Sequence, residues 1–114
     1  MRYLLQVYFH GAQARVEQLP EAERHAVVEE YIAFFASPEV KDGNRLQPPA
    51  TATTVRVHNG DTVRRTGPVS AAGEPLAGYY LVEAADLDAA VALAARIPAA
   101  RMGGEVEVRP VVEQ

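Results

Sequence analysis

Histidine side chains are the groups in this sequence best suited to proton transfer near neutral pH, because an unperturbed imidazole has a pKa of about 6.5. His25 is the sharpest candidate. On a helix it would lie at the edge of the apolar stripe formed by Val28, Ile32 and Phe35, and it would point near a cleft between helix and sheet. A histidine there could act as a general base or a general acid. The alternative is a boundary histidine that pairs with a glutamate of the same helix.

The other histidines are weaker candidates. His10 follows the first apolar run, where it could line the mouth of a cleft or simply end a strand, and His58 precedes a tight turn, where we expect solvent. The histidines lie on separate segments without the spacing of metal ligands, so no metal site is expected. The chain has no Cys, which excludes disulfides, thiolate catalysis, zinc ribbons and iron–sulfur clusters. It also has no glycine-rich phosphate loop and no dinucleotide fingerprint, so we expect no cofactor.

Arginine and tyrosine side chains supply the candidates for ligand binding. A strand arginine that faces a cleft can hold a carboxylate through two parallel hydrogen bonds, although strand arginines also form cross-strand ion pairs. Adjacent tyrosines at 79 and 80 place one phenol on each face of a strand, so that one can reach a cavity while the other packs. The residues expected to bind a ligand, beside His25, are Tyr8, Arg56, Thr66, Glu74 and Tyr80.

Composition limits the class of protein that carries these residues. The 114 residues are 48% hydrophobic and 23% charged, which predicts one globular domain spanning 1–114. The formal net charge of −4 argues against binding to nucleic acid or to an anionic membrane, since both attract positive surfaces. The apolar run at the N-terminus stops at His10, too early for a signal peptide or a membrane span. We therefore expect a cytoplasmic protein.

Hydrophobic periodicity predicts the elements that position these side chains. Pro20 suits the first turn of a helix, and Asn59-Gly60 between two β-branched runs predicts a tight hairpin turn. Asp86 is placed to cap a second helix, whose buried face is predicted to carry Leu87, Ala90, Val91 and Ala94. The small alanines on that face would let the helix lie close to a sheet. The predicted strands cover 2–9, 51–58, 61–65, 78–84 and 105–112, the predicted helices cover 20–36 and 87–97, and 38–49 is predicted to be a loop.

The order β-α-β-β-β-α-β predicts an α+β ferredoxin-like sandwich, with two helices on one face of a mostly antiparallel sheet. The strands at 2–9 and 78–84 are apolar on both sides, so the face without helices needs a cover. A symmetric homodimer, with sheet packed against sheet, would supply it. The alternative is that the loop 38–49 and the hairpin fold over that face.

The sequence contains, in order, the segments LQPPATATTVRVHNGDTV, TGPV, EPLAGYYLVEAADLDAAVALAARIPAA and GGEVEVRPVVE. Together these segments resemble the YCII-related family, and most closely its branch named for an Asp-Gly-Pro-Phe motif. The resemblance implies a ferredoxin-like subunit in a dimeric α+β barrel, and it implies little about chemistry. The motif itself is Thr66-Gly67-Pro68-Val69 here, so its acid is absent while the Gly-Pro turn remains. Of the Ala-Glu-Thr-Lys-Glu run that commonly follows in the family, only Glu74 of the charged residues is kept.

Three functions are compatible with these observations. The first is a homodimer that binds a small anionic or aromatic metabolite in a cleft between sheet and helix or between subunits. The second is a cofactor-free enzyme of isomerase or lyase type, in which His25 transfers the proton; the absence of the motif acid weakens this hypothesis. The third is a regulatory or interaction module.

Overall fold

The main sheet is built around the central strand β1 (Arg2–Tyr8), whose alternate side chains Tyr3, Leu5 and Val7 are buried. We describe residues 1–70 and 75–113 from a computed structural model. The other elements, in chain order, are α1 (Ala12–Glu17), α2 (Glu21–Phe35), β2 (Val40–Arg45), the 3₁₀ turn η1 (Pro49–Thr51), β3 (Thr53–His58), β4 (Asp61–Thr66), β5 (Gly78–Glu83), α3 (Leu87–Ala95), α4 (Pro98–Arg101) and β6 (Glu105–Pro110).

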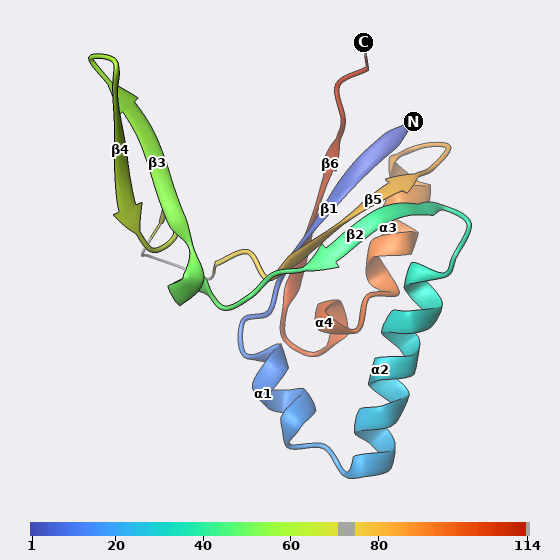
Figure 1. The fold of residues 1–114 in the computed structure, drawn as a ribbon. Helices are drawn as coiled ribbons and strands as arrows, with labels where there is room; N and C mark the ends of the chain where they lie inside the picture. Colours follow the sequence, from blue (N-terminus) through green and yellow to red (C-terminus); the bar gives the residue numbers. More distant parts are fainter. Residues whose placement is uncertain (71–74, 114) are drawn as a thin grey trace.

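Four of the strands form the main sheet, in the order β2-β5-β1-β6, and every neighbouring pair is antiparallel. The helices lie on one side of this sheet (Figure 1). Both observations are compatible with the ferredoxin-like α+β fold predicted from the sequence. The predicted hairpin does form, with Asn59 and Gly60 in the left-handed region at φ 49° and 82°, but β3 and β4 make a separate two-stranded sheet.

The hydrophobic core fills the layer between sheet and helices. Small side chains on α3 let this helix lie close to the sheet, as the alanine-rich sequence indicated. Phe34 of α2 packs edge-on against Tyr80 of β5, with ring centroids 4.9 Å apart. The side chain of Asp86 caps α3 by accepting a hydrogen bond from the Ala89 N–H at 2.8 Å, which satisfies one free donor of the first turn.

Two element predictions were wrong. The predicted loop 38–49 contains an edge strand, β2, although its sequence VKDGNR has the composition of a turn. Gly43 allows this strand to form here, because a Cβ at this position would collide with the Tyr80 ring and lie 2.9 Å from the Tyr79 carbonyl oxygen. Pro98 does not simply end a helix, since it begins the short helix α4, where its missing N–H is harmless.

The buried faces of the two long helices also differ from the prediction. Val27 and Phe34 are the buried residues of α2, whereas Val28, Ile32 and Phe35 are about half exposed or more. On α3 the buried residues are Ala90, Leu93 and Ala94, whereas Leu87 and Val91, predicted to be buried, are about half exposed. A 3.6-residue period defines a stripe but does not fix which of two adjacent stripes faces the core.

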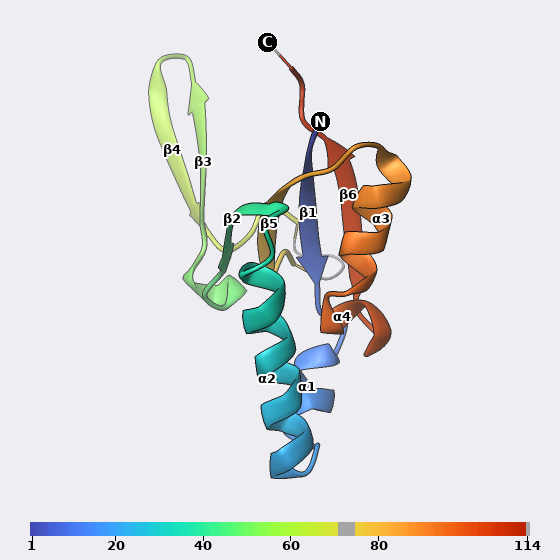
Figure 2. The ribbon, with the colours of Figure 1, turned by 90° about the vertical axis from the view of Figure 1, so that its right-hand side faces the viewer.

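The β3–β4 hairpin, called the arm below (residues 53–66), stands away from the rest of the chain. Figures 1 and 2 show it on the side of the sheet opposite the helices, diverging from the sheet above their common base. Neither the arm nor the segment around β2 folds over the face that the helices leave bare: β2 extends the edge of the sheet, and the arm projects outward. That bare face, called the open face below, carries Leu4, Gln6 and Tyr8 of β1 and the residues that pair with them.

Candidate functional site

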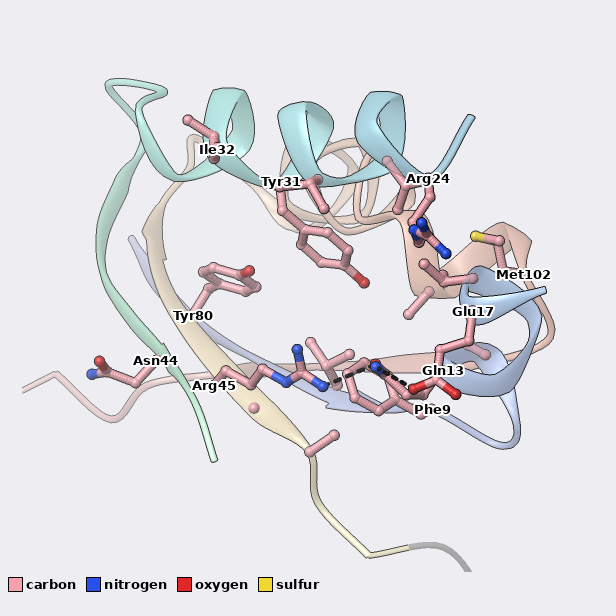
Figure 3. Close-up of a pocket in the computed structure, with 18 residues that line it drawn as sticks. Phe9, Gln13, Glu17, Arg24, Tyr31, Ile32, Asn44, Arg45, Tyr80 and Met102 are labelled. Carbon is pink, nitrogen blue, oxygen red and sulfur yellow. Dashed lines mark hydrogen bonds between the residues drawn. The ribbon is translucent and has the colours of Figure 1, made fainter. Parts of the chain in front are cut away.

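A cavity of about 400 Å³ lies between the sheet, α1 and α2, on the helix-covered side (Figure 3). The N-terminal part of α2 extends beside α1, past the end of the sheet (Figure 1). The walls of the cavity are mostly apolar, and its polar groups come from four different elements. Its lining includes the side chains of Phe9, Gln13, Glu17, Arg24, Tyr31, Arg45 and Tyr80.

Arg45, the last residue of β2, is held on one wall of the cavity. Its Nη2 donates a hydrogen bond to Oε1 of Gln13 at 2.9 Å, and Nε2 of Gln13 donates in turn to Oε1 of Glu17 at 3.3 Å. The Arg45 guanidinium also lies 5.6 Å from the centroid of the Phe9 ring, within cation–π distance. These contacts fix the planar guanidinium, which reduces the entropy that it would lose on binding an anion.

Arg24 supplies a second guanidinium from α2, opposite the wall that carries Arg45 (Figure 3). Within residues 1–70 and 75–113, no carboxylate lies within ion-pair distance of either arginine. Glu17 lies on the same side of the cavity as Arg24, and its carboxylate offsets part of the positive charge of the two arginines. Two guanidiniums without ionic partners above apolar walls form an environment that favours a bound anion.

Tyr31 of α2 and Tyr80 of β5 point into the cavity (Figure 3). Burial raises the pKa of the Tyr31 phenol, and the Ala99 backbone and the positive charge of Arg45 offset part of that effect. Burial also raises the pKa of Tyr80, and the neighbouring Tyr31 raises it further. Both phenols therefore keep their protons at neutral pH and are available as hydrogen-bond donors to an anion.

An adjacent hollow of about 540 Å³ shares Phe9, Gln13, Arg45 and Ala77 with the cavity and is otherwise lined by the proline-rich segments at the base of the arm. The hydrogen-bonded pair Arg45 and Gln13 therefore separates the cavity from this hollow.

The structure separates the residues that the sequence analysis grouped. Tyr80 lines the cavity, whereas Tyr8 alternates with the buried residues of β1 and so belongs to the open face. Arg56 and Thr66 lie exposed on the arm. His25 is exposed on α2 and is absent from the lining of the cavity that the described residues form. Glu74 lies outside the described residues.

Arg24, Arg45 and Tyr31 line the cavity but were not among the predicted ligand-binding residues. A signal for Arg24 was present, because it precedes Val28 by four residues and so shares the stripe from which His25 was chosen. Val28 and Ile32 of that stripe do line the cavity, while remaining exposed at its mouth. Arg45 carried no comparable signal, since its segment was predicted to be a loop.

The altered motif Thr66-Gly67-Pro68-Val69 closes the base of the arm. Gly67 is in the left-handed region at φ 105°, and its N–H donates to the Ala52 carbonyl at 2.8 Å. Thr54 Oγ1 donates to the Gly67 carbonyl at 2.8 Å, and Arg65 donates to the Pro68 carbonyl at 3.1 Å. These backbone contacts give the retained Gly-Pro pair a structural role, because they tie the two ends of the arm together.

Two of the histidines contact polar side chains. His10 Nε2 lies 2.9 Å from Glu105 Oε1, and His58 lies 3.3 Å from the Asn59 amide at the tip of the arm. In the part of the chain that the structure describes, no three His, Asp or Glu side chains converge as a metal ion would require. No described helix combines the length and the apolar character needed to cross a membrane.

Comparison with known proteins identifies the family. The profile of the YCII-related domain matches residues 1–114. A relative from Rhizobium meliloti (strain 1021), described as an uncharacterized protein, is 38% identical over 68 residues, which is 59% of this chain and 55% of the relative. The matched stretch thus spans only about half the length of that protein. Since the profile covers every element described above, the chain belongs to the YCII-related family.

Proposed function

We propose that this protein binds a small anionic metabolite with an aromatic or other apolar body in the cavity between α1, α2 and the sheet. The observation that carries the proposal is the placement of Arg24 and Arg45, without ionic partners among the described residues, over an apolar cavity. The anionic group would accept hydrogen bonds from the two guanidiniums and from the Tyr31 and Tyr80 phenols. The apolar part would contact side chains such as Val28 and Ile32.

The size of the cavity agrees with a ligand of this kind. Pockets for small molecules usually enclose about 300–1,000 Å³. A volume of about 400 Å³ falls at the lower end of that range and suits a ligand of one or two rings rather than a dinucleotide.

Binding is better supported than proton transfer. A catalytic base needs a group that can accept a proton near neutral pH, yet burial favours the protonated form of both phenols in the cavity, and the carboxylate of Glu17 already accepts a hydrogen bond from Gln13. His25, the proton carrier of the enzymatic alternative, lies outside the cavity lining. No described contact favours the regulatory alternative.

A pair of probes that differ only in charge tests the proposal. We expect 2-naphthoate to raise the thermal midpoint of the protein and to give a measurable binding isotherm by calorimetry, and we expect its neutral analogue 2-naphthamide to do neither. Arg45→Gln should abolish the response to 2-naphthoate, whereas Arg56→Gln on the arm, which removes the same charge away from the cavity, should preserve it. Equal binding of both probes, or an unchanged response of Arg45→Gln, contradicts an anion site in this cavity.

We also propose that the binding unit is a homodimer with the dimeric α+β barrel arrangement. The open face supports this proposal, because Leu4 and Tyr8 of β1 and Leu81 of β5 remain partly exposed on it. Sedimentation equilibrium at micromolar concentration tests it, and a single species of 12.3 kDa would contradict it.

A further inference from the structure

We propose that two copies of this chain exchange their arms, so that the Val55 and Val57 side of each β3–β4 hairpin packs on the open face of the partner. This inference rests on the proposed homodimer and adds a contact to it: the arms cover the part of each open face that the contact between the two sheets leaves exposed. The separate position of the arm, its amphiphilic faces and the size of the exposed surface each support it.

Among residues 1–70 and 75–113, the arm has little to pack against. Figure 1 shows that it leaves the body of the molecule between the end of β2 and the start of β5, and within the described residues its strands pair with each other and with no other strand. Val57 is 70% exposed and Val55 is 57% exposed. An isolated two-stranded hairpin is at best marginally stable in water, so an arm of this kind requires a surface to pack against.

The total exposed area indicates how large that missing contact is. A compact monomer of 12.3 kDa should expose about 6,100 Å². This chain exposes 7750 Å², an excess of about 1,600 Å² over that expectation. Its radius of gyration is 16.1 Å, against about 13 Å for a compact domain of this length. Covering the excess on both copies would bury about 3,200 Å², within the range of permanent homodimers.

The register of the hairpin assigns its side chains to two faces. Val55 pairs with Arg64 and Val57 pairs with Thr62, so these four side chains share one face. Val63 lies on the other face with Arg56 and His58. The first face therefore combines the two most exposed valines of the arm with one arginine at its side, which suits a contact with an apolar centre and an acidic margin.

The open face offers that combination. Its centre carries Leu4, Tyr8, Tyr79 and Leu81, which lie on adjacent strands in the observed register. Its margin carries the acids Asp42, Glu83, Glu105 and Glu107, and all but Asp42 form an ion pair within the described residues. Arg64 on the contact face of the arm could therefore pair with Asp42. The size of the exposed area favours an arm from a second copy over other occupants, because it matches a permanent homodimer and the same chain supplies both apolar surfaces.

A matched pair of substitutions on the arm tests the contact. Val57→Asp and His58→Asp each place an acid on adjacent residues of β3, but on opposite faces. Val57 is largely exposed within its own chain, so Val57→Asp should leave the thermal midpoint of the isolated subunit nearly unchanged. We expect Val57→Asp to raise the dimer Kd at least about tenfold, as a charge in an apolar contact does, and His58→Asp to leave it within about twofold.

Sedimentation of the unsubstituted protein separates the two proposals. A dimer that Val57→Asp weakens while His58→Asp does not supports arm exchange. A dimer that neither substitution weakens overturns arm exchange and leaves the homodimer standing. A monomer at micromolar concentration overturns both, and the cavity proposal is tested separately by 2-naphthoate.

Cross-linking provides a second measurement if Val57→Asp fails to fold. The chain has no Cys, so single cysteines can be introduced without further changes. A Val57→Cys chain mixed with a mass-tagged Gln6→Cys chain should form a mixed cross-link with a short bismaleimide, and His58→Cys should form much less. Equal yields from the two arm positions, or cross-links only within a Val57→Cys/Gln6→Cys double variant, contradict the exchange.

Discussion

Arg45 and Gln13 are 32 positions apart in the sequence, and Nη2 of the arginine donates to Oε1 of the glutamine at 2.9 Å. This contact joins the end of an edge strand to a short helix that follows the central strand. The Gln13 amide donates in turn to the carboxylate of Glu17. The guanidinium is therefore linked to an acid through Gln13 and does not contact that acid directly. Arg45 is therefore oriented without being neutralised by a direct ion pair.

The shape of the guanidinium should matter as well as its charge. Arg45→Lys keeps the positive charge but loses the planar fork that can bind a carboxylate through two hydrogen bonds. We expect the affinity for 2-naphthoate, measured by calorimetry, to fall about tenfold. Arg56→Lys on the arm is the control and should leave the affinity unchanged. Full affinity of Arg45→Lys would show that only the charge contributes.

Two adjacent phenylalanines on α2 should differ sharply in their contribution to stability. Phe34 is 1% exposed and packs against Tyr80, whereas Phe35 is 50% exposed. Phe34→Ala should lower the free energy of unfolding by about 3–5 kcal/mol, because it leaves a cavity in the core. Phe35→Ala should cost about 1 kcal/mol or less. Urea denaturation at neutral pH measures both, and comparable losses would contradict the observed orientation of α2.

The cap of α3 gives a second stability prediction. Asp86→Ala removes the acceptor of the Ala89 N–H and should lower the free energy of unfolding by about 0.5–2 kcal/mol. Asp88→Ala removes an acid from the first turn of the same helix and leaves the cap in place, so it should cost less. Urea denaturation of the two variants distinguishes the cap from general charge near the helix end; equal losses would argue against the cap.

Stability should fall at high pH because of the cavity tyrosines. The pKa of Tyr31 is raised in the folded state, so its phenol holds the proton more tightly there than in the unfolded chain. The resulting stabilisation is complete below the unfolded pKa of about 10 and is lost as the pH rises through the folded pKa. Tyr31→Phe should therefore show a shallower decline in the urea midpoint between about pH 9 and pH 11. An unchanged slope would contradict the prediction.

Local sequence signals predicted the elements whose stability is encoded locally. The Asn59-Gly60 turn and the Asp86 cap are both in place, because each depends on residues within a few positions of one another. The strand β2 could not be found in this way. Its Asp42-Gly43-Asn44 centre resembles a turn, and only the Tyr80 ring from a strand more than thirty residues later explains why the glycine is needed.

The candidate site was predicted only in part for the same reason. Tyr80 could be predicted because side chains alternate along a strand, so that Tyr80 lies on the other face of the strand from Tyr79. The wall formed by Gln13 and Arg45 depends on where β2 pairs, which is a non-local property. The choice of His25 over Arg24 reflects a limit of helical periodicity, since adjacent residues differ by only about 100° and both flank the same stripe.

Arg45 pairs with Gly78, and beyond this last rung of the β2–β5 ladder the chain departs toward the arm and returns from it. The guanidinium that faces the cavity therefore belongs to the residue from which the chain departs toward the projecting hairpin. A ligand on Arg45 and a partner on the hairpin would act on the same short segment. Any factor by which the ligand changes subunit association must then equal the factor by which association changes the affinity for the ligand.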